Sequence, residues 1–225
     1  MSDLKFVWFD FGGVLSPPIP ALFEQYQAKT GLAPRVLQQA MRDVADDLGV
    51  PMLAPVESAL LTEQEWGQRL EQALRRRYPQ IDLSRARLQT FGEQWFAGVP
   101  ANAPLVAAVR ALKRAGWRVG ILTNNVVEWA PYWRAMVGLD EVVELIVDSS
   151  QERTRKPQAA FFQVAIERSG VAAKHSLLID DVLENIEAAA ALGWQVLHFT
   201  DNHQAITQLQ RLTGVSLLQP VGESA

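Results

Sequence analysis

The sequence predicts an α/β fold in which helices cover both faces of a parallel sheet, a doubly wound (Rossmann-like) arrangement, with an all-helical cap inserted after the first strand. Short, wholly apolar runs that end in polar residues recur along the chain, and such runs are typical of strands buried on both faces. Between residues 100 and 213 these runs alternate with segments of helix length, which indicates parallel strands joined by crossover helices. Residues 17–99 show helical periodicity without strand alternation.

The first predicted strand is Phe6–Phe9, four apolar residues that stop at Asp10. Gly12 and Gly13 follow and indicate a sharp turn. Prolines then interrupt the chain at positions 17, 18 and 20 before the predicted cap begins. Its helices are expected over residues 22–30, 34–48, 63–78 and 84–98.

The remaining strands and helices are predicted after residue 100. The strands are expected over residues 118–122, 142–147, 176–179 and 195–199, and the helices over 103–115, 159–169 and 182–192. A glycine lies near the end of each of these helices, where it can adopt the left-handed capping conformation. The core therefore comprises residues 1–16 and 100–213, the cap residues 17–99, and residues 214–225 are expected to form a flexible tail.

Composition narrows the class of protein. The chain has 225 residues, of which 48% are hydrophobic and 20% charged, so it can bury a core. A net charge of −4 gives no electrostatic drive toward nucleic acid, and no apolar run is long enough for a membrane helix or a signal peptide. The absence of cysteine excludes thiol chemistry and favours a reducing cytoplasm. We expect a monomer or homodimer that binds a small molecule.

Polar residues stand at the carboxyl ends of the predicted strands, where parallel sheets bind ligands. They are Asp10, Thr123, Asn124, Asp180 and Asp181. Three carboxylates at one sheet edge repel one another unless a cation lies among them, and an all-oxygen ligand set suits Mg²⁺. The alternative is that Asp10 and Asp180 cap the helices that follow them.

Lys156 is a further candidate, preceded by Arg155 and followed by Pro157 at the start of a predicted helix. An ammonium group directed at the carboxylates would keep a nucleophile ionised and offset the charge of a phosphoryl group. The alternative is a solvated surface charge.

Together these residues resemble the four motifs of the haloacid dehalogenase-like hydrolase superfamily, in the family's order and across nearly the whole chain. The matching segments are Phe9–Leu15, Leu122–Asn124, Arg155–Pro157 and Ile179–Asn185, the last followed by an alanine-rich helix and Leu192–Trp194. The helical insertion is similar to the cap of the subgroup that includes the N-terminal phosphatase domain of soluble epoxide hydrolases and bacterial sugar-phosphate phosphatases.

The resemblance implies a phosphatase acting on a small phosphorylated metabolite. Asp10 would attack phosphorus and form an aspartyl-phosphate, Thr123 would donate its hydroxyl to a phosphoryl oxygen, and Lys156 would bridge that oxygen and Asp10. Asn124 would contact the phosphoryl or leaving group. The family's Mg²⁺ ligands correspond to Asp10, the backbone carbonyl of Gly12, Asp180 and Asp181, with Asn185 close by.

Gly12 departs from the family pattern, because most of its phosphatases have a second Asp there that protonates the leaving oxygen and then activates water. Losing such a group costs about 10²- to 10⁴-fold in rate. The substrate could have a good leaving group, as in an anomeric sugar phosphate, an acyl phosphate or an aryl phosphate. A water or a cap residue could instead serve as the acid, or the chain could be a weakly catalytic binding protein.

Gly12 in place of the second Asp is also consistent with dehalogenases and phosphonatases, which lack that Asp. Dehalogenases of the superfamily bind no metal and lack the paired carboxylates kept here as Asp180 and Asp181. Phosphonatases need a Schiff-base lysine from the cap, where Lys29 is the one lysine between residues 17 and 99.

Several other residues have alternative interpretations. Arg153 could recognise a second anionic group or pair with Glu152 at the surface. Trp66, Trp95 and Phe96 are predicted to pack in the core, whereas Trp129 and Trp133 could line the site, pack in the core or lie at a dimer face. The three histidines, at positions 175, 198 and 203, lack metal-ligand spacing and receive no role.

Overall fold

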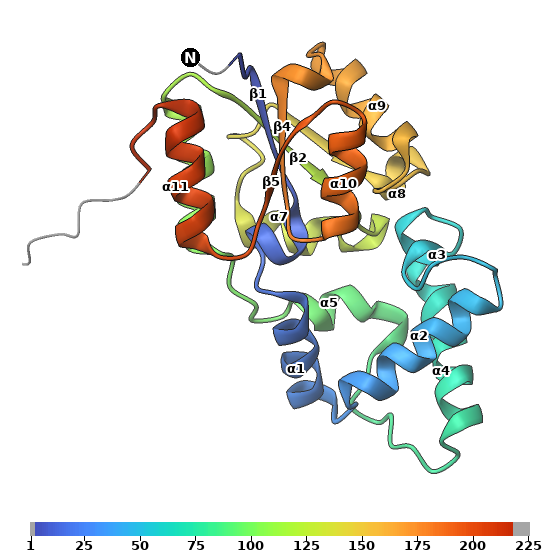
Figure 1. Cartoon of the computed structure of the whole chain (residues 1–225). Helices are drawn as coiled ribbons and strands as arrows, with labels where there is room; N and C mark the ends of the chain where they lie inside the picture. The colour runs from blue at the N-terminus through green and yellow to red at the C-terminus, as the bar shows by residue number, and fades with distance from the viewer. Residues whose placement is uncertain (1–2, 218–225) are drawn as a thin grey trace, which may run out of the picture.

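The computed structural model describes residues 3–217, so most of the predicted tail, residues 218–225, lies outside the described residues. The described chain contains a five-stranded sheet in the order β3-β2-β1-β4-β5, in which every neighbouring pair is parallel (Figure 1). The strands are β1 (Phe6–Phe9), β2 (Arg118–Thr123), β3 (Leu145–Asp148), β4 (Ser176–Asp180) and β5 (Gln195–His198).

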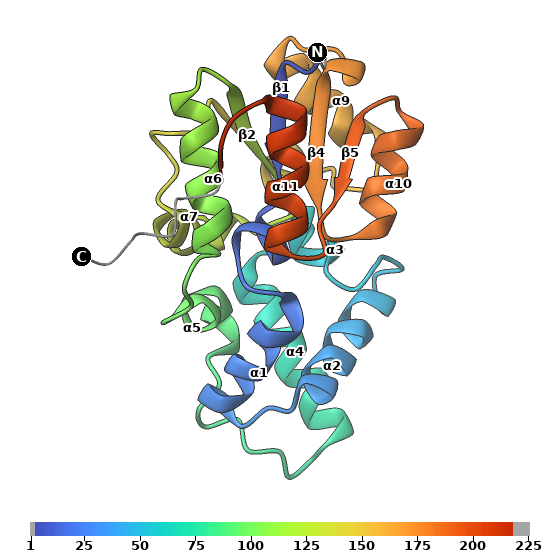
Figure 2. The same ribbon diagram turned by 60° about the vertical axis from the view of Figure 1, so that its left-hand side comes forward.

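Helices cover both faces of this sheet. On one face lie α6 (Ala103–Arg114) and α11 (Asn202–Thr213), which stand side by side in Figure 2; on the other lie α9 (Ala159–Ser169) and α10 (Leu183–Ala191). The side chains of β1 alternate between the two faces, since Val7 and Phe9 belong to one apolar cluster and Phe6 and Trp8 to the other. This two-sided burial explains why the strand is apolar throughout.

The strand order reverses between β1 and β4, and this reversal determines where a ligand can bind. Chain connections leave β1 in one direction toward β2 and β3, and the other side of β1 pairs with β4. A crevice forms at such a switch point, outside the carboxyl ends of the strands. Because Phe9 pairs with Ile179, the next residues, Asp10 and Asp180, are brought together there.

The helices between residues 17 and 99 lie together beyond the carboxyl ends of the strands (Figure 1). They are α1 (Ile19–Thr30), α2 (Pro34–Asp46), α3 (Ala54–Glu57), α4 (Glu63–Arg77) and α5 (Phe91–Phe96). Thr62 and Glu65 form a capping box at the start of α4, and Gly31 ends α1 in the left-handed conformation. We propose that this group is the predicted cap, residues 17–99.

Short elements complete the chain. They are α7 (Ala130–Val137), α8 (Ser149–Glu152), the 3₁₀ turns Leu88–Thr90, Val127–Trp129 and Ala173–His175, and an irregular helical turn at Phe11–Leu15 directly after Asp10. Within residues 3–217, none of the helices has both the length and the apolar composition of a membrane span.

The structure corrects two of the predicted elements. The prediction of a single helix over residues 84–98 is wrong, because the first of these residues form a loop. The Gln94 side chain stabilises this loop by accepting from the Arg87 amide and donating to the Arg85 carbonyl. The strand predicted over 142–147 begins only at Leu145, since the amides of Val142 and Val143 bond to Leu139 in a turn. At the start of the expected tail, Leu217 is buried.

Candidate active site

Three carboxylates converge at the switch point. Asp10 follows β1, Asp180 ends β4 and Asp181 comes next, and one oxygen of each lies within 4.8 Å of the other two. Asp10 and Asp180 are buried, with 7% and 0% of their surface exposed. The three predicted acidic metal ligands therefore share one place, as expected from the strand ends.

Lys156 lies among these carboxylates and is only 1% exposed. Its Nζ is 2.9 Å from Asp10 Oδ1 and 2.5 Å from Asp180 Oδ2. The interpretation of Lys156 as a solvated surface charge is therefore wrong. Although burial opposes its charge, the carboxylates of Asp10 and Asp180 raise the pKa of Lys156, so the side chain is an ammonium.

Asn124 fixes the position of Lys156. Its side-chain amide donates to the Lys156 carbonyl at 3.0 Å, and its Oδ1 accepts from the Lys156 amide at 2.8 Å. Thr123 is fully buried at the end of β2, and its hydroxyl donates to the Asn124 carbonyl at 3.3 Å. The contacts of Thr123 and Asn124 with a phosphoryl group remain predictions.

Backbone amides orient two of the carboxylates. Asp10 accepts from the Phe11 amide at 2.7 Å, and Asp180 accepts from the Val182 amide at 2.9 Å. Asn185 also donates to both oxygens of Asp180. Asp10 is thus both the N-cap of the turn Phe11–Leu15 and a member of the cluster. The capping interpretation is wrong for Asp180, because the N-cap of α10 is Val182.

Burial and repulsion between the carboxylates raise the pKa values of two of the three carboxyl groups. Burial raises the pKa of Asp10 to about 8, opposed by Lys156 and reinforced by Asp180 and Asp181. Burial and the Asp180 charge raise the pKa of Asp181 to about 6. If all three carboxylates are ionised beside one ammonium, two negative charges are left uncompensated, and one divalent cation would neutralise them.

The residues present fit such a cation. Asp181 Oδ1 is buried and has no hydrogen-bond partner among residues 3–217, as a ligand oxygen would be without its ion. Gly13 makes room for this side chain: its φ is +75°, and a Cβ there would lie 2.2 Å from Asp181 Oδ2. An all-oxygen donor set suits Mg²⁺, and no histidine belongs to the cluster in the described part of the chain.

At position 12, by contrast, the backbone conformation does not require a glycine. Its φ of −66° and ψ of 123° are open to any residue, and a Cβ there would meet only Ile19 Cδ1, at 3.6 Å. The space beside the position of the family's second Asp is thus apolar.

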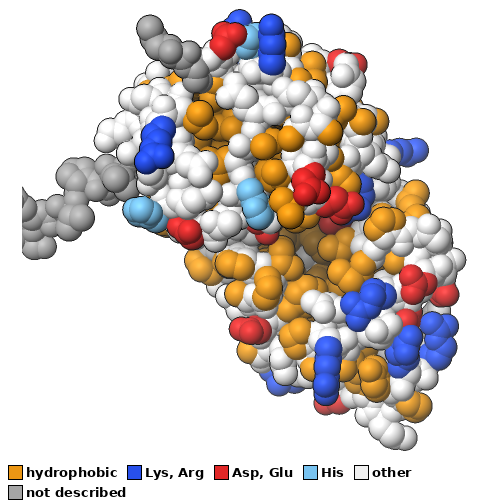
Figure 3. All heavy atoms as spheres, viewed as in Figure 1, with side chains coloured by type: hydrophobic (Ala, Val, Ile, Leu, Met, Phe, Trp, Pro, Cys, Tyr) orange, Lys and Arg blue, Asp and Glu red, His pale blue; other side chains and the backbone are white. Residues whose placement is uncertain are grey.

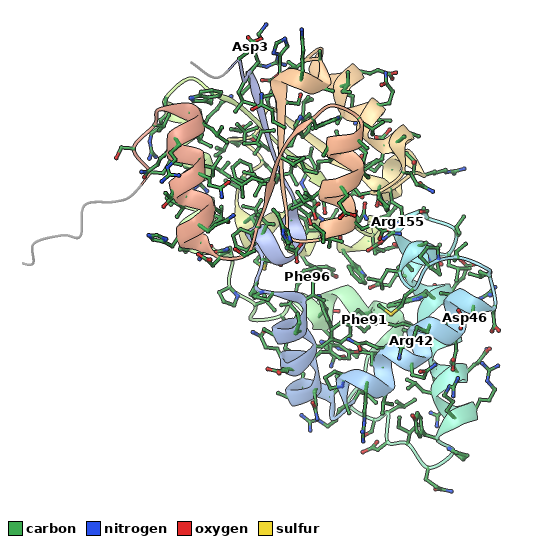
Figure 4. All side chains as sticks on the ribbon, viewed as in Figure 1. Asp3, Arg42, Asp46, Phe91, Phe96 and Arg155 are labelled. Carbon is green, nitrogen blue, oxygen red and sulfur yellow. The ribbon has the colours of Figure 1, made fainter. Side chains whose placement is uncertain are left out.

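A small cavity of about 90 Å³ lies between Gly12 and the helices of the cap. Figure 3 shows hydrophobic side chains around the hollow that separates the two parts, and Figure 4 shows Phe91 and Phe96 of α5 facing it. Phe11 and Trp129 line it from the sheet side. Trp95 and Phe96 therefore pack in the core and also line the cavity, whereas Trp133 is buried against Phe11.

Contacts between cap and core involve residues that the sequence analysis missed. Glu57 of α3 forms an ion pair with Arg155 at 2.7 Å, and its carbonyl accepts from Ser149 Oγ at 2.6 Å. Glu63 of α4 accepts from Trp129 Nε1 at 2.7 Å. No local pattern marks the two glutamates, because each pairs with a residue at least 66 positions away.

Two remaining candidates lie away from the cluster. Lys29 donates to the carbonyls of Gln94 and Trp95 within the cap, which leaves it unsuited to a Schiff base with the substrate. Glu152 pairs with Arg168, so its expected pairing with Arg153 is wrong.

Comparison with known proteins agrees with this geometry. A model of the haloacid dehalogenase-like hydrolases matches residues 4–193. The chain is 28% identical over 135 residues to the sesquiterpene phosphatase astK of Aspergillus oryzae, which covers 60% of this chain and 69% of that protein. It is 23% identical over 224 residues to the bifunctional epoxide hydrolase 2 of Sus scrofa, covering 96% of this chain but 40% of that longer protein.

Solved structures share the fold at low sequence identity. A HAD family enzyme from Bacteroides thetaiotaomicron, in complex with magnesium and inorganic phosphate, superposes with a TM-score of 0.62 at 17% identity, covering 88% of this chain and 94% of that one. The L-2-haloacid dehalogenase of Xanthobacter autotrophicus gives 0.63 at 14% identity, covering 92% and 83%.

Proposed function

The chain belongs to the haloacid dehalogenase-like hydrolase family, and within it we propose that this protein is a Mg²⁺-dependent phosphatase of small phosphorylated metabolites. The observation that carries the proposal is the group of Asp10, Asp180, Asp181 and Lys156 at the switch point of the sheet, of which all but Asp181 are buried. Phosphatases among the relatives and the magnesium and phosphate bound to a structural neighbour support it.

Asp10 is the proposed nucleophile. Its carboxylate oxygen bonds to phosphorus as the bond to the leaving oxygen breaks, and that oxygen departs with the electron pair. Water then attacks phosphorus, and the bond to Asp10 breaks to release phosphate. Lys156, at 2.9 Å from Asp10, favours the ionised nucleophile and offsets charge on the phosphoryl oxygens.

The other residues bind and orient. Thr123 would donate its hydroxyl to a phosphoryl oxygen, and Asn124 holds the backbone of Lys156 in place. Asp10, the Gly12 carbonyl, Asp180 and Asp181 would hold Mg²⁺, with Asn185 orienting Asp180. When bound, the ion supplies positive charge against the phosphoryl oxygens.

Dehalogenation is the second candidate, because Gly12 supplies no proton and dehalogenases share the fold. The paired carboxylates of Asp180 and Asp181 argue against it, since carbon–halogen cleavage by this family uses no metal. Halide release from a 2-haloacid in the presence of a chelator would favour the dehalogenase.

Phosphate release from acetyl phosphate and 4-nitrophenyl phosphate, with and without Mg²⁺, tests the phosphatase proposal. Asp10→Asn should lower the rate on both by more than about 10³-fold, because the substituted amide is not a nucleophile. The matched control is Asp140→Asn, which alters an exposed carboxylate paired with Arg134 and should keep full activity. Full activity of Asp10→Asn would show that the nucleophile is misassigned. Cytoplasmic location and a monomeric or homodimeric state stay predictions.

A further inference from the structure

The cavity beside Gly12 is positioned to receive the leaving group. Gly12 lies two residues after the nucleophile Asp10, and Asn124, which also borders the cavity, holds Lys156. The opposite walls come from α1, α2 and α5 of the cap. A phosphoryl group at Asp10 would therefore direct its ester oxygen and the group beyond it toward this space.

The walls of the cavity are mainly aromatic. The aromatic residues that line it are Phe11, Phe23, Phe91, Trp95, Phe96 and Trp129. Phe91 stacks on Trp95 and on Trp129, with ring centroids 5.3 and 5.6 Å apart. Ile19, Leu22, Met41 and Leu53 add aliphatic surface. A flat apolar group would be well accommodated between these side chains.

Most polar side chains at the cavity are already hydrogen-bonded, including Asn125, whose Oδ1 accepts from the Val126 amide. Asn124 uses both ends of its amide on the Lys156 backbone, and Ser16 accepts from the Gly13 amide and donates to the Pro17 carbonyl. Among the described lining residues, Glu57 is the one ionisable side chain, and it pairs with Arg155. Sugar hydroxyls would lose water here without gaining partners, which is costly.

The absence of an acid at Gly12 also favours an aromatic leaving group. Without an acid there, and with Ile19 as its neighbour, the leaving oxygen departs unprotonated into apolar surroundings. A phenol ionises with a pKa of about 10, as tyrosine does, whereas an alkoxide is a far stronger base. Phenoxides can therefore leave without the missing proton, and alkoxides leave slowly.

From the aromatic lining of the cavity and the absence of an acid at Gly12, we infer that the substrates are phosphate monoesters of compact aromatic hydroxyl compounds. The aromatic ring lies in the cavity beside Gly12. The inference rests on the proposed phosphatase function and selects the aryl phosphates from the three kinds of good leaving group. The cavity volume of about 90 Å³ favours a single ring over a longer chain or a fused ring system.

Four phosphorylated compounds separate the contributions of the ring and of the leaving group. Phenyl phosphate has both, acetyl phosphate has a good leaving group without a ring, cyclohexyl phosphate has a ring with a poor leaving group, and glucose 1-phosphate presents hydroxyls. We expect kcat/KM for phenyl phosphate to exceed that of each of the others by at least about tenfold, the order of effect that one apolar contact region produces.

The variant Ile19→Asn tests whether the cavity is responsible. Ile19 is 38% exposed, so the fold should tolerate the change. We expect kcat/KM for phenyl phosphate to fall about tenfold while acetyl phosphate is hydrolysed as before. Leu60→Asn is the matched control, because Leu60 is a 56% exposed cap residue that does not line the cavity.

The outcomes are distinguishable. If acetyl phosphate or glucose 1-phosphate is hydrolysed as well as phenyl phosphate, or if Ile19→Asn slows acetyl phosphate equally, the inference fails and the phosphatase proposal stands. If none of the four compounds releases phosphate with Mg²⁺ present, the phosphatase proposal fails, and the inference fails with it.

Discussion

Replacing Gly12 by aspartate restores the carboxyl group that the chain lacks, and it provides a direct test of the mechanism. The backbone at Gly12 is already extended, with φ −66° and ψ 123°, and a Cβ would contact only Ile19 Cδ1, at 3.6 Å. We therefore expect the free energy of unfolding to change by no more than about 1 kcal/mol.

The effect on rate should depend on the leaving group. A positioned acid and base contributes about 10²- to 10⁴-fold. Gly12→Asp should therefore raise kcat/KM for cyclohexyl phosphate by about 10²-fold or more. Phenyl phosphate, whose leaving oxygen needs no proton, should change much less. The assay is phosphate release with saturating Mg²⁺, alongside urea unfolding to measure stability.

Gly12→Asn is the matched control, because asparagine has nearly the same shape but cannot exchange the proton. It should leave alkyl phosphate turnover at the level of the unaltered chain. The reasoning is refuted if Gly12→Asp folds normally and keeps its activity on phenyl phosphate, yet gives no gain on cyclohexyl phosphate. The missing carboxyl group would then not be what limits turnover of alkyl esters.

Three other predictions concern the ion, the turn and the contact between cap and core. Burial raises the pKa of Asp181 from 3.8 to about 6 and that of Asp10 from 3.8 to about 8, so the metal-free fold favours the protonated carboxyls. Its free energy of unfolding should therefore fall as the pH rises from about 4 to about 8. Mg²⁺ must displace those protons, so the increase in Tm on adding Mg²⁺ should be larger at pH 8 than at pH 5; an equal increase would contradict this. Gly13→Ala should cost about 1–3 kcal/mol and weaken Mg²⁺ binding, because φ is +75° and the Cβ would overlap Asp181, whereas the neighbouring Gly12→Ala should do neither; urea unfolding and Mg²⁺ titration would measure both effects, and normal Mg²⁺ affinity in Gly13→Ala would count against the site. Glu57→Gln should lower the free energy of unfolding by about 1–3 kcal/mol, because it leaves Arg155 largely buried without its ion pair; in the Arg155→Met background the same change should cost less, and equal costs in both backgrounds would show that the pair is not coupled.

Much of the core was predictable from local pattern. The apolar run Phe6–Phe9 predicts a strand buried on both faces, and in the structure each of its residues belongs to one of two apolar clusters. The carboxylates at its end and at the end of β4 follow from the same signal, since parallel strands bring their carboxyl ends to one edge. The order and spacing of the four motifs then indicated the family, which the match over residues 4–193 confirms.

Other features had no local signal. The loop at residues 84–87, where the predicted helix over residues 84–98 fails to begin, depends on one side chain, Gln94, bonding to backbone groups seven and nine positions away. Lys156 taken alone resembles a surface lysine, and only its approach to Asp10 and Asp180 gives it a buried ammonium. These contacts join residues far apart in the chain, whose proximity depends on how the elements pack.

The sequence by itself determined which residues end the strands and which charges meet there, because strand periodicity and the parallel arrangement are local or nearly local properties. Only the tertiary structure decided what faces those charges. Packing of α1, α2 and α5 over Gly12 creates an aromatic cavity, and the ion pair of Glu57 with Arg155 joins cap to core. Apolar residues that look alike along a helix can fill a core or line a cavity, and their side chains are assigned to one or the other by the shape of the neighbouring surface.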